Sequence, residues 1–470
     1  MNNKLKIIVK DIFRYAYNKL PMNIRTSSLY RKTYEETYNF LEESEYWSKE
    51  KMQKYQNEKL HDLILYAYNN VPYYKKLFDD LAIDPDSITD TESLKKVPYL
   101  TKDIIKEEGE RMLSTAVHKN KRIRHETGGS SGKPISIWYE KDIVKAKEDA
   151  FVARIWGRIG YNDTDRIAIF RDINFIREME MVDKNIVYKR MPGTNKFYFS
   201  FGNLRKETIQ KYREAIIKIK PQWIIAYPAS LYYLVQLLDV NMESPFDSLK
   251  GIIFMSETLY PHQIKVFKKF FNVKMLHAYG HTEKACLAGT CEESMRFHIQ
   301  PEYGIAEFIE NDGMMELVAT GFINNCMPLI RYKTQDLFVL SSEKCSCGRE
   351  HQLIESIEGR TGDRIYLSDG SIVTDTYCDF AISQSIWQSK VEQFQVRQDK
   401  VGFCEIWYIP LSDKEDIHKL EAEIKSDCEN YLYNKIIVTP KKVDNIPRTI
   451  RGKQKLIVSA IGCDKESKTN

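Results

Sequence analysis

The sequence predicts an α/β protein in which a large domain is followed by a small α+β domain. Between residue 123 and about residue 361, short β-rich runs alternate with charged helical stretches such as residues 205–220. This alternation is typical of α/β folds with a mainly parallel sheet. A chain of 470 residues is also too long for one ordinary core, which favours at least two domains.

The elements follow in order along the chain. Residues 1–115 are polar and helical, and they form a helical lead-in to the large domain. The expected strands of that domain are residues 135–139, 166–170, 223–226, 251–255 and 274–278. In the C-terminal part the expected strands are residues 391–396, 402–409 and 435–443, and the expected helix is 414–434. The predicted domains are therefore 1–361 and 362–470.

The N-terminus carries a basic helix pattern. Eight basic residues and one acid, Asp11, occur in the first 32 positions, and apolar residues recur at helical spacing from Leu5 to Leu20. Such a helix can lie on an anionic membrane surface, although an apolar face packed on the protein's own core is commoner and is favoured here. Residues 1–20 are kept as a candidate peripheral membrane contact.

Composition excludes several classes of protein. A formal charge of +4 is nearly balanced and argues against nucleic acid as a partner, and 12% aromatic residues argue against disorder. The sequence has neither an apolar run of the roughly 18 residues that span a bilayer nor a secretory apolar segment. We therefore expect a cytoplasmic protein, peripheral to the inner face of the membrane if the basic helix binds there, with its oligomeric state left open.

A glycine-rich loop precedes the first expected strand. It consists of Thr127, Gly128, Gly129, Ser130, Ser131, Gly132 and Lys133. Glycines allow a backbone to approach a ligand closely, and the hydroxyl groups and the lysine suit polyphosphate. Pro134 follows the lysine, so the loop is not a Walker A motif. Taken alone, such a loop is more often a plain turn.

Four further stretches strengthen the phosphate interpretation. Tyr279-Gly280-His281-Thr282-Glu283 offers a hydroxyl and a carboxylate suited to a phosphate and its Mg²⁺. Asp336 can accept two hydrogen bonds from a ribose diol. Arg360 lies beside flexible glycines at the predicted domain boundary, and Lys453 follows Gly452 near the C-terminus.

In this order and spacing, the five stretches resemble the signature motifs of the adenylate-forming acyl-CoA synthetase superfamily. The phenylacetate-CoA ligase family, in its CapK-like branch, is the closest match. Tyr46-Trp47, residues 71–74 and residues 97–102 extend the resemblance over nearly the whole chain. The resemblance implies a large multi-sheet AMP-binding domain and a small mobile C-terminal domain that carries the catalytic lysine.

The resemblance also implies roles for individual residues. Residues 127–133 would hold the ATP phosphates, and Lys453 would bridge the carboxylate and the α-phosphate. Thr282 would contact the α-phosphate, and Glu283 would hold Mg²⁺. The remaining nucleotide-binding residues would be Ser256, Glu257 and Tyr279 around the adenine, Gly280 and His281 beside them, Asp336 on the ribose, and Arg360 near the ribose and phosphate. Lys453 could instead be a solvated surface lysine, but a catalytic role is favoured. His281 could be a general base, but lining of the pocket is favoured.

Three departures from the family pattern concern turns. Gln335 stands where the family commonly has glycine before the ribose-binding acid, and Ser256 stands at the glycine of a Ser-Gly-Glu motif. Gly362 occupies a hinge position that is often acidic in relatives. The first two departures place the local backbone turn or the adenine contacts in doubt.

The nine cysteines all lie between Cys286 and Cys463. Cys345-Ser346-Cys347 is a C-x-C knuckle that could present two thiolates to one metal, or its cysteines could be free thiols. Some members of the family hold zinc between these loops, so the resemblance implies a structural Zn²⁺ bound by Cys291, His298, Cys345 and Cys347. Cys286 and His351 are the alternative ligands.

The predicted function is ATP-dependent activation of a carboxylic acid to an acyl-adenylate, with release of pyrophosphate, followed by transfer to a thiol such as that of CoA. The alternative is an adenylyl- or acyltransferase that acts on a sugar or amino-acid acceptor in capsular polysaccharide assembly. A non-catalytic, zinc-stabilised binding protein is disfavoured, because it would have no need of Lys133, Glu283, Asp336, Arg360 and Lys453 together. Several aromatic residues either line the acyl pocket or belong to the core: Trp138, Tyr139, Phe170, Tyr227 and Tyr232.

Overall fold

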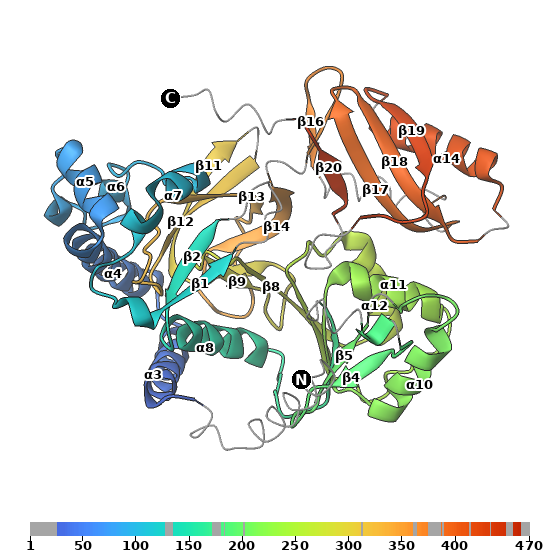
Figure 1. Cartoon of the computed structure of the whole chain (residues 1–470), viewed down its shortest axis with the longest axis horizontal. Coiled ribbons are helices and arrows are strands. Elements are labelled where there is room, and N and C mark those ends of the chain that lie inside the picture. Colours follow the sequence, from blue (N-terminus) through green and yellow to red (C-terminus); the bar gives the residue numbers. More distant parts are fainter. Residues whose placement is uncertain are drawn as a thin grey trace, which may run out of the picture.

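The structure is a computed structural model that describes residues 26–126, 135–171, 180–182, 184–200, 203–311, 314–360, 364–374, 387, 390–412, 415–432, 434–447 and 455–461, without the side chains of His262, Arg360, Thr374 and Tyr431. Two large parts surround a central sheet, and a third part, formed by the C-terminal strands, lies against them (Figure 1). None of the described helices combines the length and apolar character needed to cross a bilayer.

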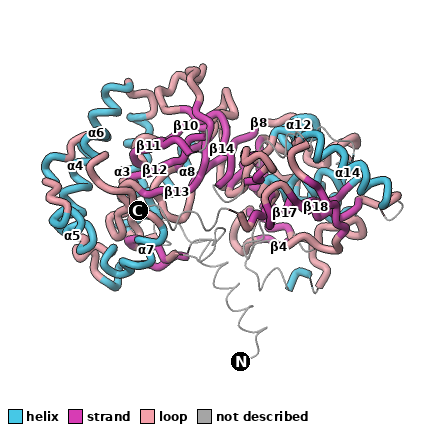
Figure 2. The backbone as a smooth tube through the Cα atoms, turned by 90° about the horizontal axis from the view of Figure 1, so that it is seen from above, coloured by secondary structure: helices cyan, strands magenta, loops and turns pink. Residues whose placement is uncertain are grey.

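The predicted lead-in is helical. It comprises α3 (Ser28–Ser44), α4 (Lys49–Asn70), α5 (Pro72–Asp80), η1 (Pro85–Ser87), α6 (Thr91–Leu94), α7 (Lys102–Glu108), η2 (Gly109–Met112) and η3 (Lys119–Lys121). The side chains of Ser27 and Ser48 cap the first two of these helices, and Pro72 occupies the first turn of α5. These helices gather at one side of the molecule (Figure 2), and their apolar residues join the core of the sheet.

One sheet of twelve strands organises the large domain. Its order is β11-β12-β13-β14-β10-β9-β8-β7-β6-β3-β5-β4. Its first six strands along the chain are β3 (Ile167–Phe170), β4 (Tyr188–Arg190), β5 (Lys196–Phe199), β6 (Trp223–Ala226), β7 (Gly251–Met255) and β8 (Lys274–Gly280). The other six are β9 (Leu287–Gly289), β10 (Phe297–Ile299), β11 (Gly304–Asn311), β12 (Met314–Gly321), β13 (Tyr332–Leu340) and β14 (Leu353–Arg360).

The prediction of a mainly parallel sheet is correct only for the centre of this sheet. Strands β5, β3, β6, β7 and β8 are parallel, whereas β4 and β9–β14 pair antiparallel. The predicted strand at 135–139 is β2 (Ser136–Glu140), which pairs only with β1 (Arg122–Glu126) in a separate hairpin. Antiparallel strands need no crossover helix, so helix–strand alternation in the sequence did not reveal them.

Helices cover both faces of the parallel strands. The helices α10 (Ile209–Ile219), α11 (Pro228–Leu238) and α12 (Pro261–Phe271) lie together on one face (Figure 1), where they pack on Ile224 and Phe254. Trp223 and Ile253 face the other core, which α8 (Val144–Gly157) shares. Burial on both faces is the reason that these strands are continuous apolar runs.

The C-terminal strands form a smaller unit with its own core. Its four-stranded sheet has the order β19-β18-β17-β20, with β17 (Val391–Lys400), β18 (Phe403–Pro410), β19 (Ile437–Lys442) and β20 (Ile457–Ser459). The helix α14 (Ile417–Tyr431) packs on one face of this sheet, and β15 (Arg364–Tyr366) pairs with β16 (Ile372–Thr374) in a hairpin. The three strands and the helix predicted for this part are therefore confirmed, while the boundary at 361/362 stays a prediction because residues 361–363 lie outside the described residues.

The close approach of Gly251 to Trp223 gives a test of this packing. A Cβ atom at Gly251 would lie 2.5 Å from Trp223 Cζ3 and 3.1 Å from the Lys274 carbonyl oxygen. We expect Gly251→Ala to lower the free energy of unfolding by about 1–3 kcal/mol, measured as a lower urea midpoint. Gly157→Ala is the control, because a Cβ atom there meets nothing within 4 Å; an equal loss in both variants would contradict the packing.

Candidate active site

The carboxyl ends of the central parallel strands bring the predicted nucleotide motifs together. Ser256 and Glu257 follow β7, and Tyr279 and Gly280 end the neighbouring β8. Asp336, from β13, reaches the same place, because the Tyr279 hydroxyl donates a hydrogen bond of 2.6 Å to Asp336 Oδ2. Ligands of open α/β sheets bind at this edge.

Glu283 is the buried carboxylate of the site, with a side chain that is 9% exposed. His281 Nδ1 lies 3.1 Å from Glu283 Oε2, and the Tyr332 hydroxyl donates a hydrogen bond of 3.0 Å to Glu283 Oε1. Burial alone would raise the pKa of Glu283, but the hydrogen bond and charge of His281 lower that pKa to about 2. The carboxylate is therefore ionised and able to hold a divalent cation.

The turn that carries Thr282 and Glu283 is fixed from outside the motif. The Tyr139 hydroxyl donates to the Thr282 carbonyl oxygen, and Lys284 forms an ion pair of 2.7 Å with Glu148. On a third side, the backbone of Gly321 packs closely against the turn, since a Cβ atom at this position would lie 2.8 Å from the Lys284 carbonyl oxygen. These contacts hold the turn in one position.

Glu257 is held in place by two neighbouring segments. The backbone amide of Ala229, in the first turn of α11, donates to Glu257 Oε2 at 3.3 Å. His277 Nε2 lies 2.9 Å from the Glu257 carbonyl oxygen, and burial lowers the pKa of His277 to about 4. The neutral imidazole can therefore act as a hydrogen-bond donor that positions this turn.

The two turns in which this chain lacks the family's glycine adopt the backbone conformation that glycine favours. Ser256 has a φ angle of 67° and Gln335 has a φ angle of 65°, in the left-handed region that side chains disfavour. Lys102, at the start of α7, donates a hydrogen bond of 3.0 Å to Gln335 Oε1. Ser256 and Gln335 therefore hold the left-handed conformation that suits glycine, with local backbone strain.

A segment of the lead-in holds the start of β13. Backbone hydrogen bonds of 2.9 Å join Leu100 to both Arg331 and Lys333. The Arg331 guanidinium donates to the carbonyl oxygens of Lys95 and Val97 and forms a two-bond pair with Glu307. This attachment places Lys102 beside the turn that carries Asp336.

Some predicted residues lie outside the described part of the chain. They are Thr127, Gly128, Gly129, Ser130, Ser131, Gly132 and Lys133 of the loop, the side chain of Arg360, Lys453, and residues 1–20. The backbone of Arg360 is described, and it pairs with Asp336 across β13 and β14. The loop is flanked by β1 and β2.

The sequence did not assign several residues that hold the site together. These are Lys102, Glu148, His277, Arg331 and Tyr332; Tyr139 was expected only in the acyl pocket or the core. Arg331 and Tyr332 belong to the stretch that contains Asp336, which was the available signal for them. The others act through contacts between distant segments, which no local pattern reveals.

The four predicted zinc ligands lie together. One ligand atom from each of Cys291, His298, Cys345 and Cys347 falls within 4.8 Å of all the others. Cys291 Sγ is 3.6 Å from Cys345 Sγ, and Cys347 Sγ is 3.7 Å from His298 Nε2. Burial lowers the pKa of His298 to about 3, so its imidazole is neutral, as metal binding requires. One imidazole and three thiols suit a tetrahedral Zn²⁺ site.

The two alternative ligands lie outside this group of four. Cys286 is buried in the main core. His351 is a neighbour of His298, with ring centroids 5.7 Å apart. The described geometry thus favours the first ligand set over either substitution.

Comparisons with known proteins agree with this geometry, although no family model matches the chain. CapK of Staphylococcus aureus is 23% identical over 411 residues, which cover 86% of this chain and 89% of CapK. The phenylacetate-coenzyme A ligase of Thermus thermophilus is 25% identical over 339 residues, which cover 68% of this chain and 72% of the ligase. Among solved structures, 2-hydroxyisobutyryl-CoA ligase in the postadenylation state aligns with a TM-score of 0.69 at 15% identity, covering 90% of this chain and 92% of the ligase.

The fold is therefore that of the adenylate-forming ligases, a large α/β domain followed by a small α+β unit. Within that class, the chain is similar in sequence to CapK and to the phenylacetate-CoA ligases.

The strained turn at Gln335 can be tested with two substitutions. Gln335→Gly and Gln335→Ala both remove the contact with Lys102, so the difference between them reports the backbone. We expect the glycine variant to be more stable than the alanine variant by about 1 kcal/mol, measured by urea unfolding. Equal stability would show that the turn does not hold a left-handed residue.

Proposed function

We propose that this protein is an ATP-dependent, AMP-forming ligase that activates a carboxylic acid as an acyl-adenylate and transfers the acyl group to a thiol such as that of CoA. The observation that carries this proposal is the convergence of Tyr279, Asp336 and Glu283 at the carboxyl edge of the parallel strands. Asp336, which is held by the Tyr279 hydroxyl, suits a ribose. Glu283, which is buried and ionised, suits a metal-bound phosphate. The phenylacetate-CoA ligases among the relatives support the same chemistry.

The described residues are assigned to the nucleotide as follows. Asp336, oriented by Tyr279, accepts the ribose hydroxyl groups. Ser256, Glu257 and Tyr279 frame the adenine, with Gly280 and His281 lining the pocket beside them. Thr282 contacts the α-phosphate, and Glu283 holds Mg²⁺, which when bound neutralises phosphate charge. The loop 127–133 and Arg360 complete the phosphate and ribose contacts in this proposal.

In the first half-reaction, a carboxylate oxygen attacks the α-phosphorus and pyrophosphate leaves. Two anions must approach one another, so a cation that enters only in the reactive conformation stabilises the charge as it develops. We assign this role to Lys453. The acceptor then attacks the acyl carbon of the mixed anhydride, the bond to the phosphate oxygen breaks, and AMP leaves. One difficult condensation is thus divided into two easier steps.

We further propose that residues 362–470 form a mobile domain that carries Lys453 to and from the site. The described part of this region has its own buried core around Trp387, Tyr408 and Ile424, so it can move as a unit. A hinge near Gly362 would allow the lysine to leave after adenylation and the acceptor to enter.

The acceptor is proposed to be CoA, with an amine or hydroxyl on a sugar or amino acid as the alternative. One relative, the indoleacetate–lysine synthetase of Pseudomonas savastanoi, is 24% identical over 58% of this chain, and its name describes an amine acceptor. CapK matches more of the chain than the phenylacetate-CoA ligase of Thermus thermophilus does. A transferase role in capsular polysaccharide assembly is the second candidate.

We also propose that Cys291, His298, Cys345 and Cys347 bind a structural Zn²⁺. Four protein ligands leave no open coordination position, so the metal would stabilise the loops rather than take part in the reaction. Zinc binding would require reduced thiols, which is consistent with the expected cytoplasmic location.

Exchange of labelled pyrophosphate into ATP tests the first half-reaction. Wild-type protein should catalyse exchange only when a suitable acid is added, in a screen of aryl, fatty and amino acids. Lys453→Ala should reduce the rate by about 100-fold or more, whereas Lys425→Ala, on the exposed face of α14, should not. Absence of exchange with every acid would refute the proposed function, and full activity of Lys453→Ala would refute the role of the lysine.

Metal analysis of purified protein tests the zinc proposal. Wild-type protein should contain one zinc ion per chain, and Cys345→Ser should lose it. Cys286→Ser serves as the matched control, because Cys286 lies in the core outside the cluster. Zinc retained in full by Cys345→Ser would rule out the proposed ligand set.

A further inference from the structure

A hydrogen bond between Tyr233 and Glu392 joins the large domain to the C-terminal unit. The Tyr233 hydroxyl donates to a carboxylate oxygen of Glu392. Tyr233 belongs to α11, which lies below the C-terminal strands in Figure 1, and Glu392 is the second residue of β17. Two elements whose contacting residues are 159 positions apart in the sequence are thus held together.

Both residues of this contact are fixed within their own domains. Tyr233 is 8% exposed and belongs to the apolar core that α10, α11 and α12 share with the central sheet. Val391, the neighbour of Glu392, and Trp387 belong to the separate core of the C-terminal unit. Side chains carried by packed helices and strands are held more precisely than those on loops. The hydrogen bond therefore forms in one relative placement of the two domains.

Helix α11 connects this contact to the proposed nucleotide pocket. The backbone amide of Ala229 donates to Glu257 Oε2 at 3.3 Å, and Glu257 is assigned to the adenine. Tyr233 follows Ala229 by four residues, so the two residues lie on the same face of α11, about 6 Å apart along its axis. The start of β17 therefore contacts α11 one helical turn from the residue that binds Glu257.

The start of β17 also lies at the end of the C-terminal unit that carries the catalytic lysine. Strands β17 and β20 are parallel neighbours, and Gln395 Nε2 donates a hydrogen bond of 2.9 Å to the Lys455 carbonyl oxygen just before β20. Lys453 is two residues earlier in the sequence, and two residues of chain span at most about 7 Å. Tyr233 therefore binds the unit at its Lys453 end.

We propose that Tyr233 is a positioning residue that holds the C-terminal unit in the arrangement used for adenylation. This inference rests on the proposed function and adds to it a contact that must break when the unit moves. While the hydrogen bond to Glu392 is intact, the Lys453 end of the unit stays beside α11 and the nucleotide pocket. Loss of the hydrogen bond releases the unit for the second half-reaction, in which the acceptor enters.

Separate assays of the two half-reactions test this inference. Pyrophosphate exchange with an acid that supports it reports adenylation, and transfer from the synthetic acyl-adenylate of that acid to CoA reports the second step. Tyr233→Phe keeps the ring and removes the hydroxyl. We expect this variant to lower kcat for exchange by about 5- to 50-fold, because hydrogen bonds to charged groups are strong, with KM for ATP nearly unchanged. Transfer to CoA should be as fast as in wild-type protein or faster.

Two further variants separate the contact from general stability. Glu392→Ala removes the acceptor, so it should slow exchange as Tyr233→Phe does, and the double variant should be no slower than the slower single variant. Glu392→Ala also retains the test if Tyr233→Phe folds poorly. Tyr408→Phe is the matched control, because the Tyr408 hydroxyl donates at 3.0 Å to Glu421 within the C-terminal unit. This control should leave the ratio of the two rates unchanged.

Four outcomes would overturn the inference. Unchanged exchange in Tyr233→Phe would show that the contact does not position the unit, while leaving the ligase function intact. Equal slowing of exchange and transfer, or additive effects in the double variant, would give Tyr233 a merely structural role. A higher KM for ATP with unchanged kcat would assign the hydroxyl to nucleotide binding. Absence of exchange with every acid in wild-type protein would remove the proposed function and this inference together.

Discussion

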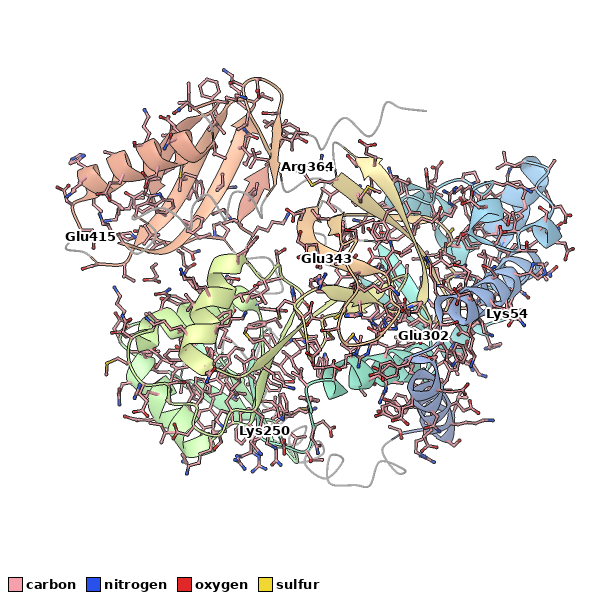
Figure 3. The ribbon with its side chains drawn as sticks, turned by 180° about the vertical axis from the view of Figure 1, so that it is seen from behind. Lys54, Lys250, Glu302, Glu343, Arg364 and Glu415 are labelled. Carbon is pink, nitrogen blue, oxygen red and sulfur yellow. The ribbon has the colours of Figure 1, made fainter. Side chains whose placement is uncertain are left out.

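The pairing of buried charges is the constraint that joins the lead-in helices to the sheet. Glu45, at the end of α3, is 9% exposed and accepts a 2.7 Å hydrogen bond from Arg349 Nε, which lies between β13 and β14. Arg154 of α8 pairs with the same carboxylate. Glu302 lies in the interior near these helices, whereas Lys54 and Glu415 lie at the outer surface (Figure 3), and the hydroxyl of Ser44 binds the Glu302 side chain. Removing one partner of a buried pair leaves a desolvated charge, so these segments must fold together.

The same constraint extends to the candidate active site through Arg331. Its pair with Glu307 and its bonds to the backbone of the lead-in fix the start of β13, and the ring of Tyr99 lies 4.4 Å from its guanidinium. The strained residue Gln335 follows four positions later, and Asp336 comes next. Backbone strain persists only where surrounding contacts determine the conformation. The attachment of the lead-in therefore explains how a non-glycine residue is tolerated beside Asp336.

Local pattern was enough to predict four of the five parallel strands, the helical lead-in, and three strands and the helix of the C-terminal unit. The family resemblance supplied the four cysteine and histidine residues of the cluster. They predicted residues whose chemistry is carried by their own short motif, such as Glu283 and Asp336. The sequence pattern missed β4 and β5. It also missed β9–β14, because mixed burial and short turns give no helix–strand alternation. The sequence pattern also missed Lys102 and His277, since these residues gain their roles only from segments that the fold brings close.

The arginines around the cluster of three cysteines and His298 link the charge of that cluster to the rest of the fold. Three thiolates and one Zn²⁺ would carry a net charge of −1, which is costly to bury without compensation. Arg349 interacts with the Cys347 sulfur as well as with Glu45, and Arg158 and Arg296 act on Cys291 and Cys345 through their charges. Because Arg349 is shared between the cluster and α3, loss of the metal would alter the electrostatic balance that holds Glu45. The cluster and the lead-in helices are therefore one electrostatic unit, although about 250 residues of sequence separate Glu45 from Cys291.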